Sequence, residues 1–260
     1  MMNKYQKEKE AFGRLLEVMD DLREKCPWDS KQTMDSLRSL TIEEVYELTE
    51  AIIEKDIPNI KKELGDVLLH IVFYAKIASE TKDFDITDVI HSLCDKLIHR
   101  HPHIYATTKA NTAGDVERNW EQIKLKEKNG NKSVLSGVPS TLPALIKSYR
   151  IQDKARNVGF DWEKREQVWE KVKEEINEVQ TEIESQNQDL LENEFGDLLF
   201  SIINVARHYN VDPETALERT NQKFIKRFNY LENKTIKQGK NLKEMTLAEM
   251  DKIWNEAKKI

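Results

Sequence analysis

Residues 63–69 read ELGDVLL and residues 194–200 read EFGDLLF, so one acidic and apolar motif returns after 131 positions. The same displacement relates residues 43–47, EEVYE, to residues 174–178, EEINE. Two motifs that keep both their order and their spacing indicate an internal duplication rather than a chance similarity within an acidic chain. The sequence therefore predicts two copies of one module, each with an EExxE motif followed by an ExxD motif.

Apolar residues continue from each ExxD motif at spacings of three and four. In the first copy they are Leu64, Val67, Leu68, Ile71, Val72 and Ala75; in the second copy they are Phe195, Leu198, Leu199, Ile202, Ile203 and Ala206. This spacing predicts amphipathic helices whose apolar stripes face a core. Among 260 residues only eight are glycine and six are proline, whereas 34% are charged, which favours helices over β-turns. We predict an all-α fold built as two tandem copies of a four-helix-bundle-like module.

The division of the chain follows from its turn-forming residues. Asn, Gly, Ser and Pro gather between positions 128 and 141, which predicts a linker at 128–141 between an N-terminal domain, 1–127, and a C-terminal domain, 142–260. Thr112 and Thr246 each stand three residues before an acidic residue, in the pattern of a capping box that opens a helix. These two helices should be the last of their copies.

Charge balance and cysteine count exclude several classes of protein. The formal net charge is −6, so the chain lacks the basic field behind non-specific nucleic-acid affinity, and we expect no direct nucleic-acid binding. Only Cys26 and Cys94 are present, without a CxxC motif, which argues against a disulfide framework or a zinc knuckle and favours a reducing cytoplasm. No stretch approaches the roughly 18 apolar residues of a membrane span. We expect a cytoplasmic protein with no membrane partner.

The carboxylates of the two motifs should converge. Glu175 and Glu178 are three residues apart on one helix, and Glu194 and Asp197 are three apart on the next, beside its apolar stripe. If the two helices pack together, four or five carboxylates meet, and clustered like charges are costly unless a cation neutralises them. All the donors are hard oxygen atoms, which favours Mg²⁺, with Mn²⁺ as a substitute, over zinc or copper.

The acidic motifs also fit structural roles and a different metal. In a chain with 47 acidic residues an ExxE motif is usually a solvated helix face. Thr41 and Glu44 also fit a capping box, which would give Glu44 a structural task. A di-iron site would need Glu-x-x-His, but positions 66 and 197 are both aspartate, so iron is disfavoured. The duplication of both motifs favours the metal site.

Basic and aromatic residues accompany the acidic motifs in both copies. Lysine and arginine stand four apart at Lys96 and Arg100, and again at Lys223 and Arg227. Tryptophan and lysine stand four apart at Trp120 and Lys124, and again at Trp254 and Lys258. Such pairs can be surface charge and core aromatics, but opposite a metal cluster the cations would clamp a polyphosphate and the indole would stack on a base. No P-loop is present, so a nucleotide would be held through metal and side chains.

Together with CPWD at 26–29, RHPH at 100–103 and NVGFDW at 157–162, the acidic motifs resemble the MazG family of nucleoside triphosphate pyrophosphohydrolases. The resemblance covers nearly the whole chain. It implies an all-α fold, a homodimer and dependence on Mg²⁺. It also implies hydrolysis of NTPs and dNTPs at the α–β anhydride, giving the nucleoside monophosphate and pyrophosphate.

The resemblance also implies roles for residues of the second copy. The implied Mg²⁺ ligands are Glu175, Glu178, Glu194 and Asp197. The implied catalytic residues are Glu174 and Glu175, of which Glu174 would orient or deprotonate the attacking water. The implied substrate-binding residues are Lys171, Lys223, Arg227, Trp254 and Lys258. Attack of water on the α-phosphorus needs no covalent nucleophile, so this inventory suits the reaction.

The first copy supplies a second candidate site. Its members are Glu43, Glu44, Glu47, Glu63, Asp66, Lys96, Arg100, Trp120 and Lys124. The counterpart of Lys171 is Leu40, so this copy has lost one phosphate contact. In the family the C-terminal domain is regarded as the active one, which implies that the N-terminal copy is structural, regulatory or weakly active. Two alternatives stay open: a house-cleaning hydrolase of special nucleotides, such as a damaged dNTP or an alarmone, and a non-catalytic helical dimerisation scaffold.

Overall fold

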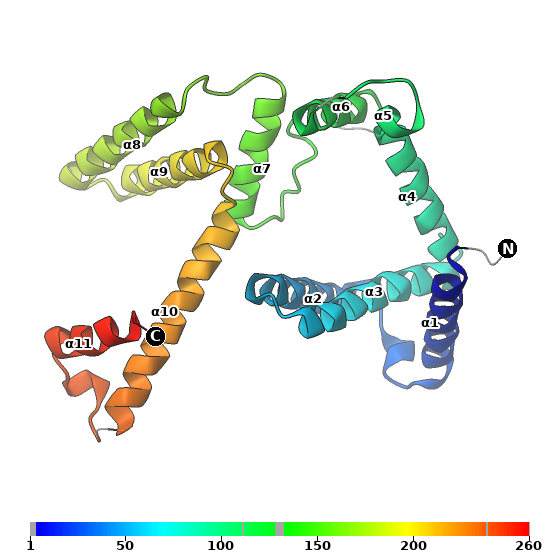
Figure 1. Ribbon diagram of the computed structural model, residues 1–260, viewed down its shortest axis with the longest axis horizontal. Helices are drawn as coiled ribbons and strands as arrows, with labels where there is room; N and C mark the ends of the chain where they lie inside the picture. The colour runs from blue at the N-terminus through cyan, green and yellow to red at the C-terminus, as the bar shows by residue number, and fades with distance from the viewer. Residues whose placement is uncertain (1–3, 111, 128–132, 238, 260) are drawn as a thin grey trace. The chain divides into compact units, whose positions relative to one another are not determined.

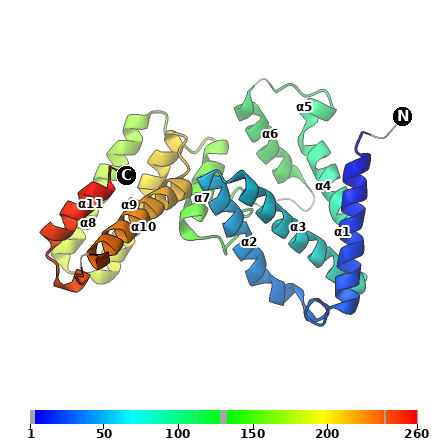
Figure 2. The same cartoon turned by 60° about the horizontal axis from the view of Figure 1, so that its bottom comes forward.

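The protein is described from a computed structural model that covers residues 4–110, 112–127, 133–237 and 239–259. Every regular element in these ranges is a helix, so the all-α prediction is confirmed. The chain divides into two compact units, a first unit, Met1–Asn111, and a second unit, Thr112–Ile260. Each unit contains a long helical pair, α2 beside α3 in the first and α8 beside α9 in the second (Figures 1 and 2).

The first unit is built around its two carboxylate helices. Its elements are α1 (Gln6–Lys25), η1 (Asp29–Lys31), α2 (Met34–Glu54), α3 (Ile57–Glu80), α4 (Ile86–Arg100) and α5 (Pro102–Tyr105). Helix α3 packs against α2 along its length and also contacts α1 and α4. Met19 of α1, Leu37 of α2 and Val72 and Phe73 of α3 form the buried core. The sequence places an apolar side chain at each of these positions, so their burial holds the three helices together.

Local signals explain where the carboxylate helices of this unit begin. Thr33 caps α2, because its hydroxyl accepts a hydrogen bond from the Ser36 backbone N–H at 3.1 Å. Thr41 therefore lies inside α2, and the alternative that Thr41 and Glu44 form a capping box is wrong. Asp56 caps α3 in the same way, accepting from the Asn59 N–H at 3.2 Å. Glu44 is consequently free for another role.

The second unit repeats the helical pair and adds a long arm. Its elements are α6 (Ala113–Lys126), α7 (Ala144–Asn157), α8 (Arg165–Ser185), α9 (Gln188–His208), α10 (Pro213–Lys237), η2 (Leu242–Glu244) and α11 (Leu247–Ala257). Helix α7 packs on α9, and α11 packs on α10. Val168 and Val172 of α8 meet Val205 of α9 in a small buried cluster. The capping boxes predicted at Thr112 and Thr246 open α6 and α11, which confirms both helix starts.

The predicted domain boundaries, 1–127, 128–141 and 142–260, stay a prediction. Residues 128–132 of the expected linker lie outside the described residues. Helix α6, which the sequence assigned to the N-terminal domain, belongs by contacts to the second unit, where it touches α7. Trp120 and Lys124 therefore lie in a different unit from the carboxylates of α2 and α3.

The apolar stripes are only partly buried, which corrects the prediction that they face a core. Val72, Ala75 and Ile203 are buried. Other members of the stripes are exposed, namely Leu64, Leu68 and Ile71 on α3 and Phe195, Leu199 and Ile202 on α9. Each stripe is wider than the contact its helix makes inside the unit, so part of it is left uncovered in a single chain. Contiguous exposed apolar residues of this kind mark surfaces for association.

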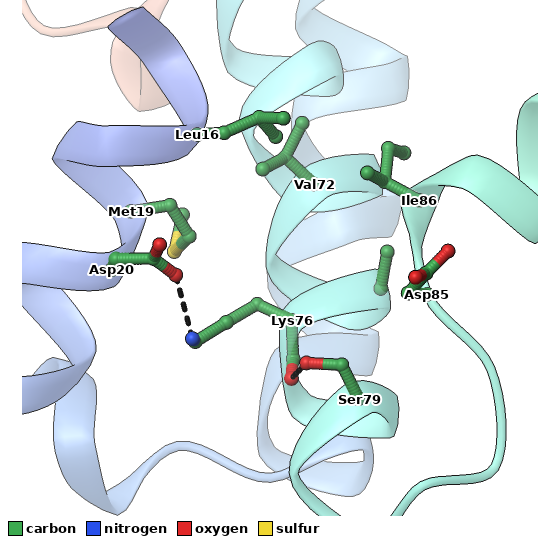
Figure 3. A pocket seen from close by; sticks show the side chains of 9 residues that line it. Leu16, Met19, Asp20, Val72, Lys76, Ser79, Asp85 and Ile86 are labelled. Carbon is green, nitrogen blue, oxygen red and sulfur yellow. Dashed lines mark hydrogen bonds and ion pairs between the residues drawn. The ribbon is translucent and has the colours of Figure 1, made fainter. Parts of the chain in front are cut away.

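A small pocket of about 190 Å³ lies in the first unit between α1, α3 and the start of α4. The Lys76 ammonium crosses it to pair with Asp20 at 2.6 Å (Figure 3). None of the predicted site residues lines this pocket. None of the helices in the described part of the chain combines the length and apolar character that crossing a membrane requires.

Candidate active site: two carboxylate clusters

The second unit brings three predicted metal ligands to one point. Glu175 extends from α8, and Glu194 and Asp197 extend from α9. One carboxylate oxygen of each lies within 4.8 Å of those of the other two. The pairing of α8 with α9 and the three-residue spacing on α9 together produce this convergence. We call these residues the second cluster.

Glu175 is the buried member of the second cluster, with 4% of its surface exposed. Its Oε1 accepts an ion-paired hydrogen bond from the Lys171 Nζ at 2.6 Å, and Glu174 Oε1 accepts from the same Nζ at 3.0 Å. Hydrogen bonds to Glu175 and then Glu174 raise the pKa of Lys171, so this lysine stays an ammonium. The other oxygen, Glu175 Oε2, is buried and accepts no hydrogen bond from any described residue.

Glu178 lies one turn beyond Glu175 and is exposed. The neighbouring Glu175 carboxylate raises the pKa of Glu178, because a proton between the two carboxylates is favoured, with smaller contributions from burial and from the Glu175 charge. Two carboxylates in such contact need a shared proton or a cation between them. The predicted ligand Glu178 therefore borders the second cluster, although its oxygens do not belong to the closest three.

The residues of the second cluster fit a hard divalent cation. All the donors are carboxylate oxygens, which Mg²⁺ and Mn²⁺ prefer. A buried carboxylate oxygen without a hydrogen-bond donor is costly, and a cation would satisfy Glu175 Oε2. Among the residues that the structure describes, the Lys171 ammonium forms ion pairs with these glutamates and balances only part of the negative charge gathered here.

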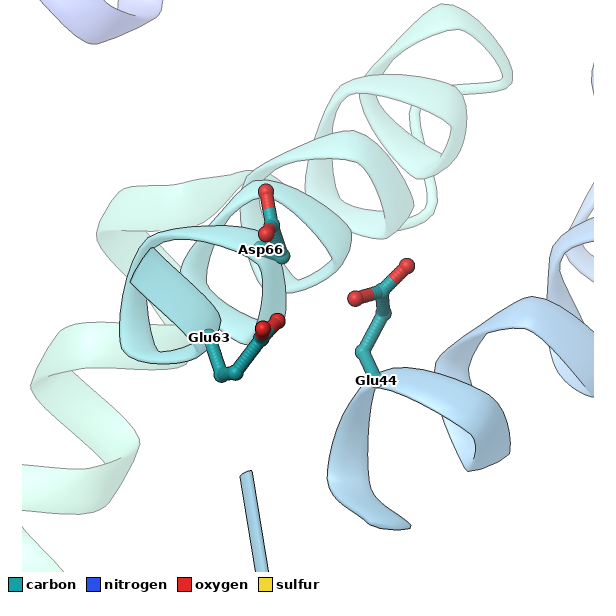
Figure 4. Close-up of side chains that lie close together, drawn as sticks. All are labelled: Glu44, Glu63 and Asp66. Atoms are coloured by element: carbon teal, nitrogen blue, oxygen red, sulfur yellow. The ribbon is translucent and has the colours of Figure 1, made fainter. Parts of the chain in front are cut away.

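The first unit has an equivalent group, which we call the first cluster: Glu44 of α2 with Glu63 and Asp66 of α3. Glu44 reaches from its helix towards the two carboxylates of α3 (Figure 4), and one oxygen of each lies within 4.8 Å of the others. Glu63 is only 2% exposed, and its Oε2 is buried without a hydrogen-bond partner among the described residues. Desolvation, followed by the charges of Asp66, Glu47 and Glu63, raises the pKa of Glu44.

Sequence reasoning missed Lys62, which borders the first cluster. The Lys62 Nζ lies 2.8 Å from Glu63 Oε1, 3.7 Å from Asp66 and 3.9 Å from Glu47. Comparison of the two copies offered a signal for this lysine. The first copy has Lys62 directly before its ExxD motif, whereas the second copy has the uncharged Asn193 there. Glu43, also predicted for this site, is exposed on α2 outside the closest group.

The predicted phosphate-binding residues of the second copy gather elsewhere in the unit. Arg227 of α10 lies over the Trp254 ring of α11, 6.0 Å from its centroid, and Phe224 packs on the same ring at 5.0 Å. The Lys258 Nζ donates to Asn255 at 2.9 Å, and Lys223 is exposed on α10. Helix α10 leads away from the α8–α9 pair and carries α11 with it (Figure 1). Among the described residues, no ion pair joins these cations to the carboxylates of α8 and α9.

In the first unit the predicted basic residues Lys96 and Arg100 lie on α4, which contacts α3. Trp120 and Lys124, predicted for the same site, lie together on α6 of the second unit, with the Lys124 ammonium 5.9 Å from the centre of the Trp120 ring. Within each unit the structure thus brings the acidic residues to one another. The predicted lysine–arginine pairs lie on helices other than those of the carboxylates, on α4 in the first unit and on α10 in the second.

Comparison with known proteins finds the same duplication. A family model described as MazG nucleotide pyrophosphohydrolase domain matches the chain twice, over residues 32–105 and 163–231. The first match contains α2 and α3, and the second contains α8 and α9, so each match includes one carboxylate cluster.

Two similar proteins agree with the family match, and one solved structure is similar to part of the chain. The nucleoside triphosphate pyrophosphohydrolase/pyrophosphatase MazG of Thermotoga maritima is 46% identical over 250 residues, covering 95% of this chain and 95% of that protein. The nucleoside triphosphate pyrophosphohydrolase of Escherichia coli strain K12 is 40% identical over 255 residues, covering 95% of this chain and 97% of that protein. The crystal structure of a mazG-related protein from Thermotoga maritima aligns with 44% of this chain and 99% of its own, at 29% identity and a TM-score of 0.40.

Proposed function

This chain belongs to the MazG nucleotide pyrophosphohydrolase family, and from that premise we propose that its second unit hydrolyses NTPs and dNTPs between the α- and β-phosphates. The products are the nucleoside monophosphate and pyrophosphate. The observation that carries the proposal is the second cluster, in which buried Glu175 keeps one oxygen that has no donor in the described part of the chain, beside Glu194 and Asp197. The catalytic domain is then 142–260, and domain 1–127 is structural, regulatory or weakly active.

Glu175, Glu178, Glu194 and Asp197 would hold Mg²⁺, with Mn²⁺ as a substitute. When bound, a divalent cation polarises phosphoryl oxygens and offsets the negative charge that develops during phosphoryl transfer. The residues suit this ion because every donor is a hard oxygen and because Glu175 Oε2, which is buried and accepts no hydrogen bond from the described residues, gains a partner.

Glu174 and Lys171 complete the chemistry on α8. Glu174 is exposed one residue before buried Glu175, so its carboxylate can accept a hydrogen bond from a water molecule and remove its proton. Hydrogen bonds to Glu175 and Glu174 raise the pKa of Lys171, so the side chain stays cationic. Because it is 38% exposed, it can also turn towards a phosphate. The attack needs no covalent intermediate on the chain.

A homodimer is part of the proposal. The apolar residues Phe195, Leu199 and Ile202 are exposed on α9, and a second copy of the chain would cover them. Association would also allow the α10–α11 arm of one chain to approach the carboxylates of the other. The residues on this arm that we propose for substrate binding are Lys223, Arg227, Trp254 and Lys258. Light scattering tests the dimer by the mass in solution.

Phosphorus NMR of the purified chain with a panel of NTPs and dNTPs, with and without Mg²⁺, tests the activity. We expect pyrophosphate and monophosphate only with metal. Glu175→Gln combined with Glu178→Gln should remove the products, whereas Glu170→Gln, which changes an exposed glutamate on the same helix, should not. Orthophosphate with diphosphate would contradict the assigned bond. No turnover of any nucleotide, with no effect of Mg²⁺ on thermal stability, would favour the dimerisation scaffold instead.

A further inference from the structure

The NVGFDW motif at 157–162 forms most of the loop between α7 and α8, and the proposed function gives it no task. Its aspartate, Asp161, reaches the carboxyl end of α9. The Arg207 Nη1 donates to one carboxylate oxygen of Asp161 at 2.9 Å, the Arg207 Nη2 donates to the other, and the His208 Nε2 lies 3.0 Å from that second oxygen. Because only three residues separate Asp161 from α8, this contact holds the start of α8 beside the end of α9.

Apolar burial contributes little to holding this loop. Val158, Phe160 and Trp162 are all exposed, Phe160 by 82% of its surface. The side chain of Arg207, by contrast, is 4% exposed and that of Asp161 is 20% exposed. A buried guanidinium with two hydrogen bonds to one carboxylate is a strong contact of defined geometry. The ion pair is therefore the main polar link between the loop and α9 among the described residues.

The other contacts at this end of α8 are more exposed to water. The Trp169 Nε1 donates to the Tyr209 hydroxyl at 3.3 Å, and the Arg165 guanidinium lies 4.8 Å from the centre of the Tyr209 ring. Trp169 and Tyr209 are each 46% exposed. Since water competes for exposed polar groups, these contacts are weaker than the buried ion pair.

The α8–α9 pair is joined by the chain at one end only (Figure 1). Residues 186 and 187 connect the two helices there. Glu175 of the second cluster lies ten residues from each end of α8, Arg165–Ser185. At about 1.5 Å per residue it is about 15 Å from either end. Its alignment with the carboxylates of α9 therefore depends on how both ends of the pair are held.

The apolar core of the pair does not fix this alignment by itself. Val168, Val172 and Val205 hold the helices together, but hydrophobic contacts are not directional and allow one helix to slide or turn against the other. Hydrogen bonds are directional. The bonds between Asp161 and Arg207 supply that direction at the end that the chain leaves open.

The first unit holds the same end of its helical pair with a different arginine. Asp29 of the CPWD motif stands 132 positions before Asp161. Arg23 of α1, whose side chain is 9% exposed, donates to the Asp29 carbonyl oxygen and pairs with Glu80, the last residue of α3. Both units thus place a buried arginine where the loop meets the end of the second carboxylate helix, although the two arginines lie on non-equivalent helices.

We propose that Asp161 is a positioning residue for the second cluster. Through Arg207 it fixes the register of α8 against α9, and thereby the separation of Glu175 from the carboxylates of α9. Asp161 acts through the helices and does not itself contact the cation. This inference rests on the proposed function, because it requires that the second cluster bind a divalent cation.

A purely structural role for Asp161 makes a different prediction. Loss of the ion pair would then lower the free energy of unfolding but leave the metal affinity of the folded molecules unchanged. If Asp161 sets the register of the helices, the molecules that remain folded bind the cation more weakly. Metal affinity, measured where every variant is folded, therefore distinguishes the two roles.

The test uses the full chain with Glu44→Gln and Glu47→Gln, which disable the first cluster. Mn²⁺ affinity is measured by electron paramagnetic resonance of the free ion, at a temperature at which circular dichroism shows each variant folded. Asp161→Asn keeps the size of the side chain and removes its charge. It should weaken Mn²⁺ binding about tenfold, the lower end of the effect seen when groups that orient metal ligands are lost. Asp161→Glu, which keeps the charge, should recover part of the affinity.

Two further variants separate register from stability. Leu231→Ala removes a side chain that is 3% exposed on α10, outside the α8–α9 pair, so it should destabilise the unit and leave Mn²⁺ affinity unchanged. Arg207→Gln should weaken Mn²⁺ binding as much as Asp161→Asn, and the two together should add little, because both remove one contact. Arg207→Lys, which keeps the charge and loses the paired hydrogen bonds, replaces any of these that does not fold.

The proposal is wrong if Asp161→Asn binds Mn²⁺ as tightly as its background, or if Leu231→Ala weakens binding equally. Either result leaves the proposed function standing as long as the unmutated chain releases pyrophosphate. Weaker binding in Asp161→Asn alone supports the positioning role even if the unmutated chain releases no pyrophosphate, a result that would overturn only the proposed activity. A background that binds no Mn²⁺ removes the metal site and the positioning role together.

Discussion

The two units gather the same groups around one point but divide them differently between their helices. Among the described residues, each unit has a trio of carboxylates, a buried glutamate with one oxygen that accepts no hydrogen bond, and a lysine paired to that glutamate. The buried glutamate is Glu63 of α3 in the first unit and Glu175 of α8 in the second. The charge arrangement of a duplicated site is therefore maintained even though equivalent positions no longer carry equivalent residues.

The layer beneath the carboxylates differs as well. In the first unit the Thr41 hydroxyl lies 2.9 Å from His70 Nδ1 and 2.7 Å from the Tyr74 hydroxyl. Desolvation lowers the pKa of His70, partly opposed by the Asp66 charge, so the ring favours its neutral form. The equivalent positions of the second unit, 131 residues later, hold Val172, Ser201 and Val205, of which the two valines belong to an apolar core. The first cluster thus rests on a polar network and the second on an apolar core.

Removing charge from one cluster at a time is expected to give the largest difference between the units. Glu175→Gln with Glu178→Gln should lower pyrophosphate release at least ~10³-fold, because metal-centred charge stabilisation is lost. Glu44→Gln with Glu47→Gln should retain most of the release. Pyrophosphate release under saturating Mg²⁺ measures both, with circular dichroism to show that each variant folds. If the second pair of changes abolishes release and the first does not, the catalytic unit has been assigned to the wrong half.

Removing the acidic partner of an arginine should lower the free energy of unfolding more in the second unit than in the first. Arg207, buried in the second unit, donates from Nη1 to Asp161 at 2.9 Å and also bonds the other carboxylate oxygen. Asp161→Ala should cost about 3 kcal/mol, because it leaves a buried guanidinium without its counter-charge. Glu80→Ala in the first unit should cost less than about 1 kcal/mol, since Glu80 is half-exposed and Arg23 keeps backbone acceptors. Urea unfolding measures both; equal losses would contradict this difference.

Replacing Lys171 should reduce catalysis less than removing the carboxylates does. Lys171→Met is expected to lower kcat/KM about 100-fold, the effect of losing one charged contact to the reacting phosphates. Lys171→Arg should recover part of the activity, and Lys173→Met, which changes an exposed lysine on the same helix, should have no effect. Steady-state kinetics with Mg²⁺ and an NTP gives the values. A Lys171→Met enzyme with unchanged kcat/KM would remove Lys171 from the substrate contacts.

The smallest expected difference is a pH dependence in the first unit. The hydrogen bond from Arg23, opposed by desolvation and aided by the arginine charge, lowers the pKa of Glu80 below its usual 4.5. Because the unfolded carboxyl binds its proton at higher pH, the stabilisation is complete above about pH 4.5 and disappears as pH falls through the lower folded pKa. Unfolding of the native chain and of Glu80→Gln should differ by less than about 1 kcal/mol at pH 7 and converge in acid. A difference that persists undiminished as the pH falls below the usual carboxyl range would contradict the assignment.

Much of the fold follows from local sequence. The capping boxes at Thr112 and Thr246 open helices where they were predicted, because a cap depends on residues within one turn. The convergence of Glu194 and Asp197 with Glu175 required only helical spacing and the pairing of two helices. Spacing did not reveal that Leu64 and Leu199 are exposed, because burial depends on which neighbouring helix covers a face.

By itself, the sequence determined that this protein is all-α, that it is a tandem duplication, and that each copy carries an EExxE motif followed by an ExxD motif. These properties are local or periodic, so they can be read without knowing what packs against what. Only the tertiary structure decided that Glu63 and Glu175 are the buried glutamates and that Lys62 takes from α3 the position that Lys171 takes from α8. Which glutamate of a motif is buried depends on the separation and rotation of the paired helices, and these are set by the packing of the whole unit.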